Sequence, residues 1–213
     1  MKRIVVLVSG RGSNFAALLD ANLPAEFAAV ISNRPGAPAL DLASSRNVPT
    51  ITLDHTLYAN RESFDLALAE EIDRHQPDVV VLAGFMRVLT ENFVNRYRAR
   101  LVNIHPSLLP AFPGLATHER ALAAGVKIHG CTVHFVTPEL DHGLIIVQAA
   151  VAVRDDDDAA TLAARVLAQE HRIYPLAVRW LLEGRLKLTQ DGRVFLSGAL
   201  PPSAALISPG GPE

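Results

Sequence analysis

The stretch Ile4-Val5-Val6-Leu7-Val8, followed directly by Ser9-Gly10-Arg11-Gly12-Ser13-Asn14, decides the fold class. Its first five residues are all apolar, which is typical of a strand buried on both faces of a sheet. A glycine-rich polar loop comes next, and a helical pattern over residues 15–20 follows the loop. A buried strand, a tight loop and a helix in this order predict the first unit of an α/β fold with a parallel sheet.

The alternation of strand and helix patterns continues along the first half of the chain. Apolar runs at 28–31, 50–53 and 78–84 predict strands, and helical patterns at 39–46 and 61–75 lie between them. Ligands of such sheets bind beyond the carboxyl ends of the strands. We therefore expect the functional residues in the loops that follow the strands.

The second half of the chain has a different pattern. A strand at 101–105 is followed by a Pro-rich loop, a short helix at 117–124 and two strand patterns at 133–136 and 144–147 that read as a hairpin. A long helix is predicted over 159–182, and the acidic run at 155–158 reads as a solvated loop that caps it.

These patterns predict a single domain at 1–197 with a mostly parallel, Rossmann-like sheet and helices on both faces. Its halves are about 1–100 and about 101–197, and the second half contributes the hairpin and the long helix. Residues 198–213 are rich in Pro, Gly, Ser and Ala, and we expect a flexible tail there.

Composition and charge limit the class of protein. The 213 residues are 49% hydrophobic and carry a formal net charge of -2, so neither nucleic acid nor a membrane surface is expected as a partner. The single cysteine, Cys131, excludes an intramolecular disulfide and suits the reducing cytoplasm. The apolar start is too short for a signal peptide and no later run is long enough to cross a bilayer, so we expect a cytoplasmic protein.

The loop from Ser9 to Asn14 is a candidate anion site. The helix after it directs free backbone N–H groups and a positive dipole end at the loop, which suits a phosphate. The alternative is an ordinary tight turn in which Ser13 or Asn14 caps the helix. A dinucleotide site is less well supported, because Phe15 stands where the third glycine of the motif would be.

Asn103 and His105 end the strand at 101–105. Residues two apart on a strand share a face, so the amide and the imidazole can act on one bound group. Such a pair can stabilise an oxyanion and move protons near neutral pH. The alternative is a histidine at the end of a strand that only bonds to the backbone.

Asp141 and Glu170 each have a structural and a functional interpretation. Asp141 stands in a turn, where aspartate is common for conformational reasons alone. Glu170 interrupts an apolar stripe on the long predicted helix, so its carboxylate must be paired or must line a wet pocket.

The sequence does not favour a metal site or a cysteine nucleophile. The histidines between 118 and 142 lack the spacing of known metal motifs, and His129 and His134 would face opposite ways on one strand. Cys131 reads as a small core residue.

Five stretches in a fixed order are more specific than any one of them. They are Val-Ser-Gly-Arg-Gly-Ser-Asn at 8–14, Val-Leu-Ala-Gly-Phe-Met-Arg at 81–87, Asn-Ile-His-Pro-Ser-Leu-Leu-Pro at 103–110, Glu-Leu-Asp-His-Gly at 139–143 and Gln-Glu-His-Arg-Ile-Tyr-Pro at 169–175. Together they resemble the phosphoribosylglycinamide formyltransferase family of folate-dependent formyltransferases. The resemblance covers Lys2 to Leu188.

The resemblance implies transfer of a formyl group from 10-formyltetrahydrofolate to the amine of glycinamide ribonucleotide, a step of purine synthesis. It also implies 10-formyltetrahydrofolate as co-substrate, with no tightly bound cofactor and no metal, and we expect a monomer or homodimer. The implied catalytic residues are Asn103, His105 and Asp141. The residues implied to bind the ribonucleotide are Gly12, Ser13, Asn14 and Glu170. The residues implied to border the folate are Arg61, Met86, Arg87, Val88, Leu89, Asn103, His134, Thr137, Glu139, Leu140 and Asp141.

The chain departs from the family pattern at Ala116, Pro138 and Leu167, which affects secondary ligand contacts. Three alternatives remain: a methionyl-tRNA formyltransferase, a formyltetrahydrofolate hydrolase and a non-catalytic nucleotide-binding module. The first normally has a further RNA-binding domain and a basic surface. The second is usually preceded by a regulatory domain, and here the sheet pattern begins at Ile4. The third is disfavoured by the set of Asn103, His105 and Asp141.

Overall fold

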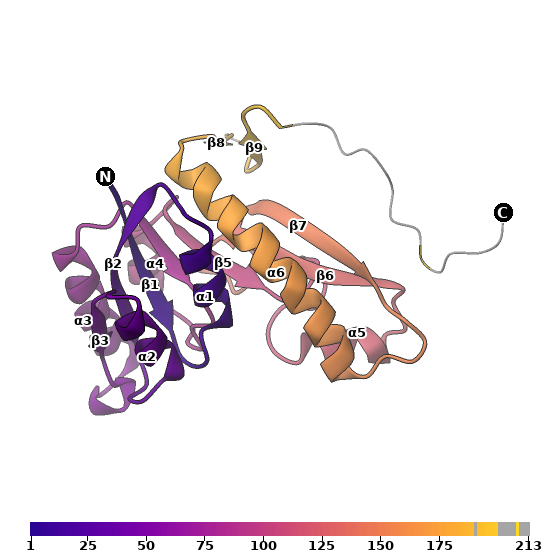
Figure 1. The fold of residues 1–213 in the computed structure, drawn as a ribbon, viewed down its shortest axis with the longest axis horizontal. Coiled ribbons are helices and arrows are strands. Elements are labelled where there is room, and N and C mark those ends of the chain that lie inside the picture. Colours follow the sequence, from indigo (N-terminus) through magenta and orange to yellow (C-terminus); the bar gives the residue numbers. More distant parts are fainter. Residues whose placement is uncertain (190, 200–207, 209–213) are drawn as a thin grey trace.

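A seven-stranded sheet in the order β3-β2-β1-β4-β5-β6-β7 runs through the centre of the computed structural model (Figure 1). The structure describes residues 1–189, 191–199 and 208, so the predicted tail lies largely outside the described residues. The strands are β1 (Lys2–Val8), β2 (Ala25–Ser32), β3 (Thr50–Thr52), β4 (Val79–Leu82), β5 (Leu101–His105), β6 (Ile128–Phe135) and β7 (Ile145–Ala152). The first five are parallel, and β6 and β7 are antiparallel additions at one edge.

Helices cover both faces of the sheet. The helices are α1 (Ser13–Asp20), α2 (Pro38–Ser45), α3 (Arg61–Arg74), α4 (Glu91–Arg96), α5 (Thr117–Ala123) and α6 (Ala159–Leu182), with a 3-10 turn, η1, at His55–Leu57. Helices α1, α2 and α6 pack in one hydrophobic core, and α3 and α4 pack in the other. The predicted fold class is therefore confirmed. Within the described residues, no helix is both long and apolar enough to cross a membrane.

Strand alternation explains the two cores and prepares the functional site. On β5, Val102 and Ile104 enter the core under α6, whereas Leu101 enters the core under α3 and α4. Asn103 and His105 share the face of Leu101, yet they are polar and belong to neither core. A cluster of polar side chains on β5 therefore begins where the core under α3 and α4 ends.

The structure differs from the sequence prediction in several places, of which three matter for the argument. Strand β6 begins at Ile128, earlier than expected, because polar residues and Gly130 interrupt its apolar pattern. A second sheet of β8 (Leu186–Leu188) and β9 (Val194–Leu196) was not predicted, since three residues give no readable periodicity. Asp158 caps α6 as expected, but the solvated interpretation was wrong for Asp157, whose buried side chain pairs with Arg165.

Candidate active site

Polar side chains from β5, from β6 and from the turn after β6 meet on one face of the sheet. Asn103 pairs with His134 in the antiparallel register of these strands, and His105 pairs with Thr132. The Asn103 Nδ2 atom lies 3.4 Å from His134 Nε2. His105 Nδ1 lies 3.4 Å from Asp141 Oδ2, and His134 Nε2 lies 4.0 Å from Asp141 Oδ1. The structure thus brings together the three residues expected to be catalytic.

His134 is a neutral support for Asn103. Its Nδ1 lies 3.0 Å from the backbone oxygen of Phe135, and a carbonyl only accepts, so the ring proton sits on Nδ1. The remaining nitrogen, Nε2, then accepts from the Asn103 amide. Burial lowers the pKa of His134, which keeps the ring neutral. The amide group of Asn103 is therefore oriented by its neighbour across the strands.

His105 is held between a carbonyl and a carboxylate. Its Nε2–H donates to the backbone oxygen of Phe112 at 3.0 Å, and its Nδ1 faces Asp141. Asp141 Oδ2 also accepts from the backbone N–H of Gly114 at 2.8 Å. Hydrogen-bond acceptors therefore face both ring nitrogens of His105. Asp141 has a φ of +52°, a conformation in which residues other than glycine are uncommon.

The glycine-rich loop leads into α1 as expected, and Gly12 has a structural role at its start. Gly12 is the N-cap of α1, with φ +77° and no side-chain capping bond in the described chain, so the capping alternative for Ser13 or Asn14 is wrong. A Cβ at Gly12 would lie 2.6 Å from the Cβ of Ala39 on α2. The glycine is needed for its φ and for packing against α2, and the first turn of α1 keeps unpaired N–H groups.

Glu170 joins α6 to this loop. Its carboxylate is only 7% exposed, and its Oε2 accepts from Asn14 Nδ2 at 2.6 Å. Burial raises the pKa of Glu170, an effect that the Asn14 hydrogen bond opposes. The Oδ1 atom of Asn14 is buried without a partner among the described residues. A paired carboxylate and an unused acceptor therefore lie beside the candidate anion loop.

Ser9 connects the loops that follow β1 and β4. Its hydroxyl accepts from the backbone N–H of Met86 at 2.8 Å and donates to Asn33 Oδ1 at 2.5 Å. Strands β2 and β3 follow β1 on one side of it in the sheet, and β4 then pairs with β1 on the opposite side. The strand order therefore reverses between β1 and β4. Ligands of open α/β sheets bind at such a switch point.

The residues expected to border the folate include exposed apolar side chains and a partly buried arginine. Met86, Val88 and Leu140 are among the exposed large apolar side chains, whereas Leu89 is buried. The Arg87 guanidinium lies 4.8 Å from the centre of the Phe64 ring, and its Nε is buried without a partner among the described residues.

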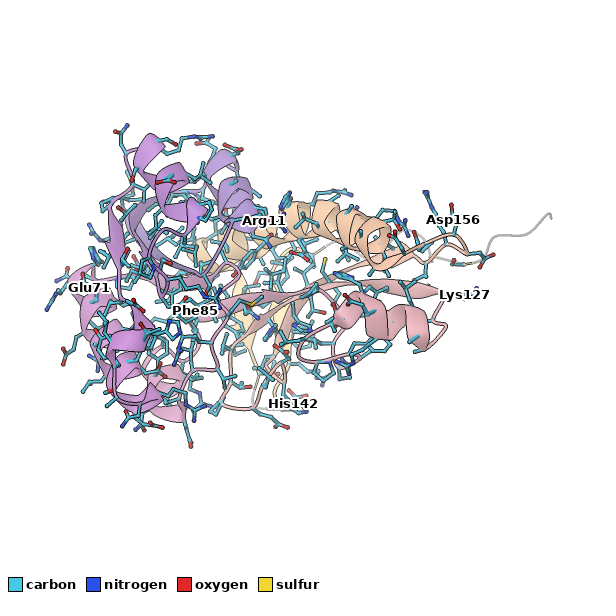
Figure 2. All side chains as sticks on the ribbon, turned by 90° about the horizontal axis from the view of Figure 1, so that it is seen from below. Arg11, Glu71, Phe85, Lys127, His142 and Asp156 are labelled. Carbon is cyan, nitrogen blue, oxygen red and sulfur yellow. The ribbon has the colours of Figure 1, made fainter. Side chains whose placement is uncertain are left out.

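The turn between β6 and β7 contains Thr137 and Glu139, two more residues that were expected to border the folate. Thr137 donates to the backbone oxygen of Glu139, and the exposed Glu139 carboxylate lies 3.4 Å from His142 Nδ1. Figure 2 shows His142 on the side of the sheet opposite to Arg11 and α6. Arg61, at the start of α3, lies 3.9 Å from Glu62 and is otherwise exposed.

Other residues of the site give no signal in the sequence. The Phe112 oxygen and the Gly114 N–H act through the backbone, so their side chains do not reveal them. Cys131 is buried in the core, and burial raises its pKa to about 12, as expected of a core residue. In the described part of the chain, no three His, Cys, Asp or Glu residues are grouped as a metal site would require.

A sheet of this order, with an antiparallel edge and a long helix, matches the solved structures of one family of enzymes, the formyl transferases. The chain belongs to that family, whose model, described as formyl transferase, matches residues 2–178. More narrowly, it is similar to phosphoribosylglycinamide formyltransferase of Escherichia coli K12, with 48% identity over 203 residues that cover 93% of this chain and 96% of that one. The resemblance found in the sequence is confirmed.

Two further relatives agree. The human trifunctional purine biosynthetic protein adenosine-3 is 44% identical over 196 residues, which are 90% of this chain and 19% of that protein. The crystal structure of glycinamide ribonucleotide transformylase 1 from Symbiobacterium toebii superimposes with a TM-score of 0.90 and 46% identity, and covers 92% of this chain and 94% of that one.

Proposed function

We propose that this enzyme transfers the formyl group of 10-formyltetrahydrofolate to the amine of glycinamide ribonucleotide, in purine biosynthesis. The observation that carries the proposal is the contact of Asn103, His105, His134 and Asp141 on one polar face. It is supported by the printed names of relatives that match nearly the whole chain. Folate is the co-substrate, and the residues of the chain supply all the groups that the reaction needs.

The reaction is a direct acyl transfer. The amine attacks the formyl carbon, a C–N bond forms, and the carbonyl oxygen becomes an oxyanion. Asn103 Nδ2 donates its second N–H toward this oxygen. The His105 ring keeps its Nε2–H on the Phe112 oxygen and shares its Nδ1–H, which lies 3.4 Å from Asp141, with the oxyanion. Such donors are worth about a hundredfold or more in kcat each. The amine proton passes to Asp141, directly or through a water, and the folate nitrogen takes up a proton as its bond to carbon breaks.

The two substrates occupy loops on either side of the sheet edge. The ribonucleotide phosphate binds at Gly12, Ser13 and Asn14, where the first turn of α1 offers N–H groups. Glu170 lies next to Asn14 and faces the rest of the nucleotide. The folate lies against the loop that contains Met86 and Val88, and the turn that contains Asp141 closes over it.

The surroundings of the enzyme follow from the same proposal. Small molecules are its partners, nucleic acid and membranes are not, and the enzyme works in the cytoplasm as a monomer or homodimer. The net charge of -2 supports these statements.

The decisive experiment measures turnover with three acceptors. Purified protein and 10-formyltetrahydrofolate are incubated with glycinamide ribonucleotide, with initiator methionyl-tRNA or with water alone, and tetrahydrofolate is followed. We expect turnover only with the ribonucleotide. Equal turnover on the tRNA would identify a methionyl-tRNA formyltransferase, and turnover with water alone would identify a hydrolase. Binding without any turnover would identify a nucleotide-binding module.

A further inference from the structure

The Pro-rich loop at 106–116 carries two of the contacts that hold the polar cluster. The Phe112 oxygen accepts from His105 Nε2, and the Gly114 N–H donates to Asp141 Oδ2. Phe112 and Ala116 have φ values of +54° and +55°, which L-amino acids rarely adopt. A loop in this conformation needs outside support to keep the two contacts in place.

That support is concentrated on one buried hydroxyl. Thr132, on β6, is 0% exposed, and its Oγ1 donates to the backbone oxygen of Ser107 at 2.7 Å. The same oxygen accepts from the backbone N–H of Leu109 at 3.0 Å and from Gln148 Nε2 at 2.9 Å. A hydroxyl offers one donor and two acceptor sites, so its bonding capacity is fully used.

The hydrogen bonds around Thr132 extend to Gln148 on β7 and to Ser107 in the loop. Gln148, on β7, also donates to the backbone oxygen of Leu109 at 2.9 Å. Ser107, itself 0% exposed, donates from its hydroxyl to the backbone oxygen of Ala111 at 2.6 Å, one residue before Phe112. Thr132 is also the partner of His105 in the β5–β6 register. It therefore lies beside the imidazole and bonds to the loop that contacts it.

We propose that Thr132 is a positioning residue, which through the loop at 106–114 fixes His105 and Asp141 in their working geometry. The inference rests on the proposed function, because it treats these two residues as catalytic. Thr132 has no exposed surface and does not itself reach a reacting atom. Removing its hydroxyl leaves the Ser107 oxygen and the Leu109 N–H without partners in a buried place, so the loop must shift to satisfy them.

The test compares Thr132→Val, which keeps the shape and removes the hydroxyl, with Thr132→Ser, which keeps the hydroxyl. Thr117→Val is the matched control, since Thr117 is 3% exposed and makes no hydrogen bond to residues 106–116 within the described part of the chain. We expect Thr132→Val to lower kcat about tenfold to a hundredfold, because small displacements of catalytic groups are costly. KM for both substrates should change by about twofold or less, since the substrate loops are elsewhere. Thr132→Ser should recover most of kcat.

A spectroscopic readout separates positioning from general destabilisation. In folded, substrate-free protein, the His105 Nε2 proton is protected from water by the Phe112 oxygen and should give a slowly exchanging NMR signal. The signal should be lost or exchange faster in Thr132→Val, and it should be retained in Thr132→Ser and Thr117→Val. An unchanged signal with unchanged kcat in Thr132→Val would overturn the proposal, and so would equal losses in the Thr117→Val control.

A milder variant covers the case in which Thr132→Val does not fold. Gln148→Leu removes one bond to Thr132 and one to Leu109 from an exposed position, so it should fold and should move the NMR signal and kcat in the same direction by less. No change in either quantity would then contradict the inference. The NMR readout needs no substrate, so a failure of the proposed function, seen as an inactive parent enzyme, is distinguishable from a failure of the positioning role.

Discussion

Asp141 is the residue in the site with the most demanding surroundings. It adopts φ +52°, accepts from the Gly114 N–H and faces the rings of both His105 and His134. An aspartate that served only to form the turn would not need to face two imidazoles. The arrangement supports a role for the carboxylate charge and for its capacity to take a proton.

We predict that Asp141→Asn lowers kcat by about a hundredfold or more, the size typical for loss of a positioned acid–base group. An asparagine can still accept from Gly114 with its side-chain oxygen, so the unfolding temperature should change little. The measurement is steady-state kinetics beside thermal unfolding, with the exposed Asp155→Asn as the control. A variant with normal kcat would show that Asp141 serves the turn alone.

Strand alternation alone predicted that Asn103 and His105 share a face, and both do. The contact between Asn103 and His134 was beyond the reach of the sequence, because it depends on the register of β5 against β6. Residue type and spacing report local geometry, whereas register is set by packing and by the turn. For the same reason, nothing in the sequence identified Thr132 as a positioning residue.

At the scale of elements, the turn between β6 and β7 depends on a close approach of two backbones. A Cβ at Gly143 would lie 1.6 Å from the Phe135 oxygen and 3.0 Å from His134 Nδ1. Glycine is therefore required there for space, and the position of the whole turn, including Asp141, depends on it.

We predict that Gly143→Ala displaces the turn and strongly lowers both stability and kcat. The matched control is Gly125→Ala, where a Cβ meets nothing within 4 Å and only the φ of +66° is unfavourable. That control should lose about 1 kcal/mol and keep its kcat. The measurements are urea unfolding and steady-state kinetics of the two variants. Similar losses of stability and kcat in both would mean that the close approach at Gly143 is easily relieved.

The elements also show where sequence patterns succeed. The bounds of α6 were predicted correctly, because Asp158 and Thr161 form a capping box and a long apolar stripe follows them. The hairpin of β8 and β9 was missed, since it packs against β7 and, through Leu186 and Val194, against the core under α6, and no local pattern encodes these contacts. Long amphipathic helices can therefore be predicted from the sequence, whereas the formation of short strands depends on tertiary contacts.

At the scale of the whole molecule, the site is assembled from both halves of one continuous sheet. The first half contributes the loops after β1 and β4, and the second contributes the polar face of β5 and β6 (Figure 1). Tyr174 of α6 joins the halves, because its hydroxyl lies 2.8 Å from the Leu82 oxygen on β4 and 3.1 Å from the Val102 oxygen on β5. A division into separately folding halves is therefore not expected.

The buried histidines give the stability of the whole molecule a particular pH dependence. Burial lowers the pKa of His118, His129 and His134, and it lowers that of His129 to about 4. In the unfolded chain, histidine titrates near ~6.5. Below that pH the unfolded chain binds protons that the folded protein resists, so stability must fall as the pH falls.

We predict that the urea midpoint decreases steadily from pH 7 to pH 5, within the window between the unfolded and folded pKa values of these histidines. Burial raises the pKa of Glu170 and Asp65, which opposes the decrease at the acid end of the window. His129→Gln should be less stable than the parent at pH 7.5, because it loses its contact with His118 at 3.3 Å, but its stability should depend less on pH. His142→Gln, on an exposed turn, is the control and should keep the parent slope. Equal slopes for all three proteins would show that His129 does not contribute to the acid sensitivity.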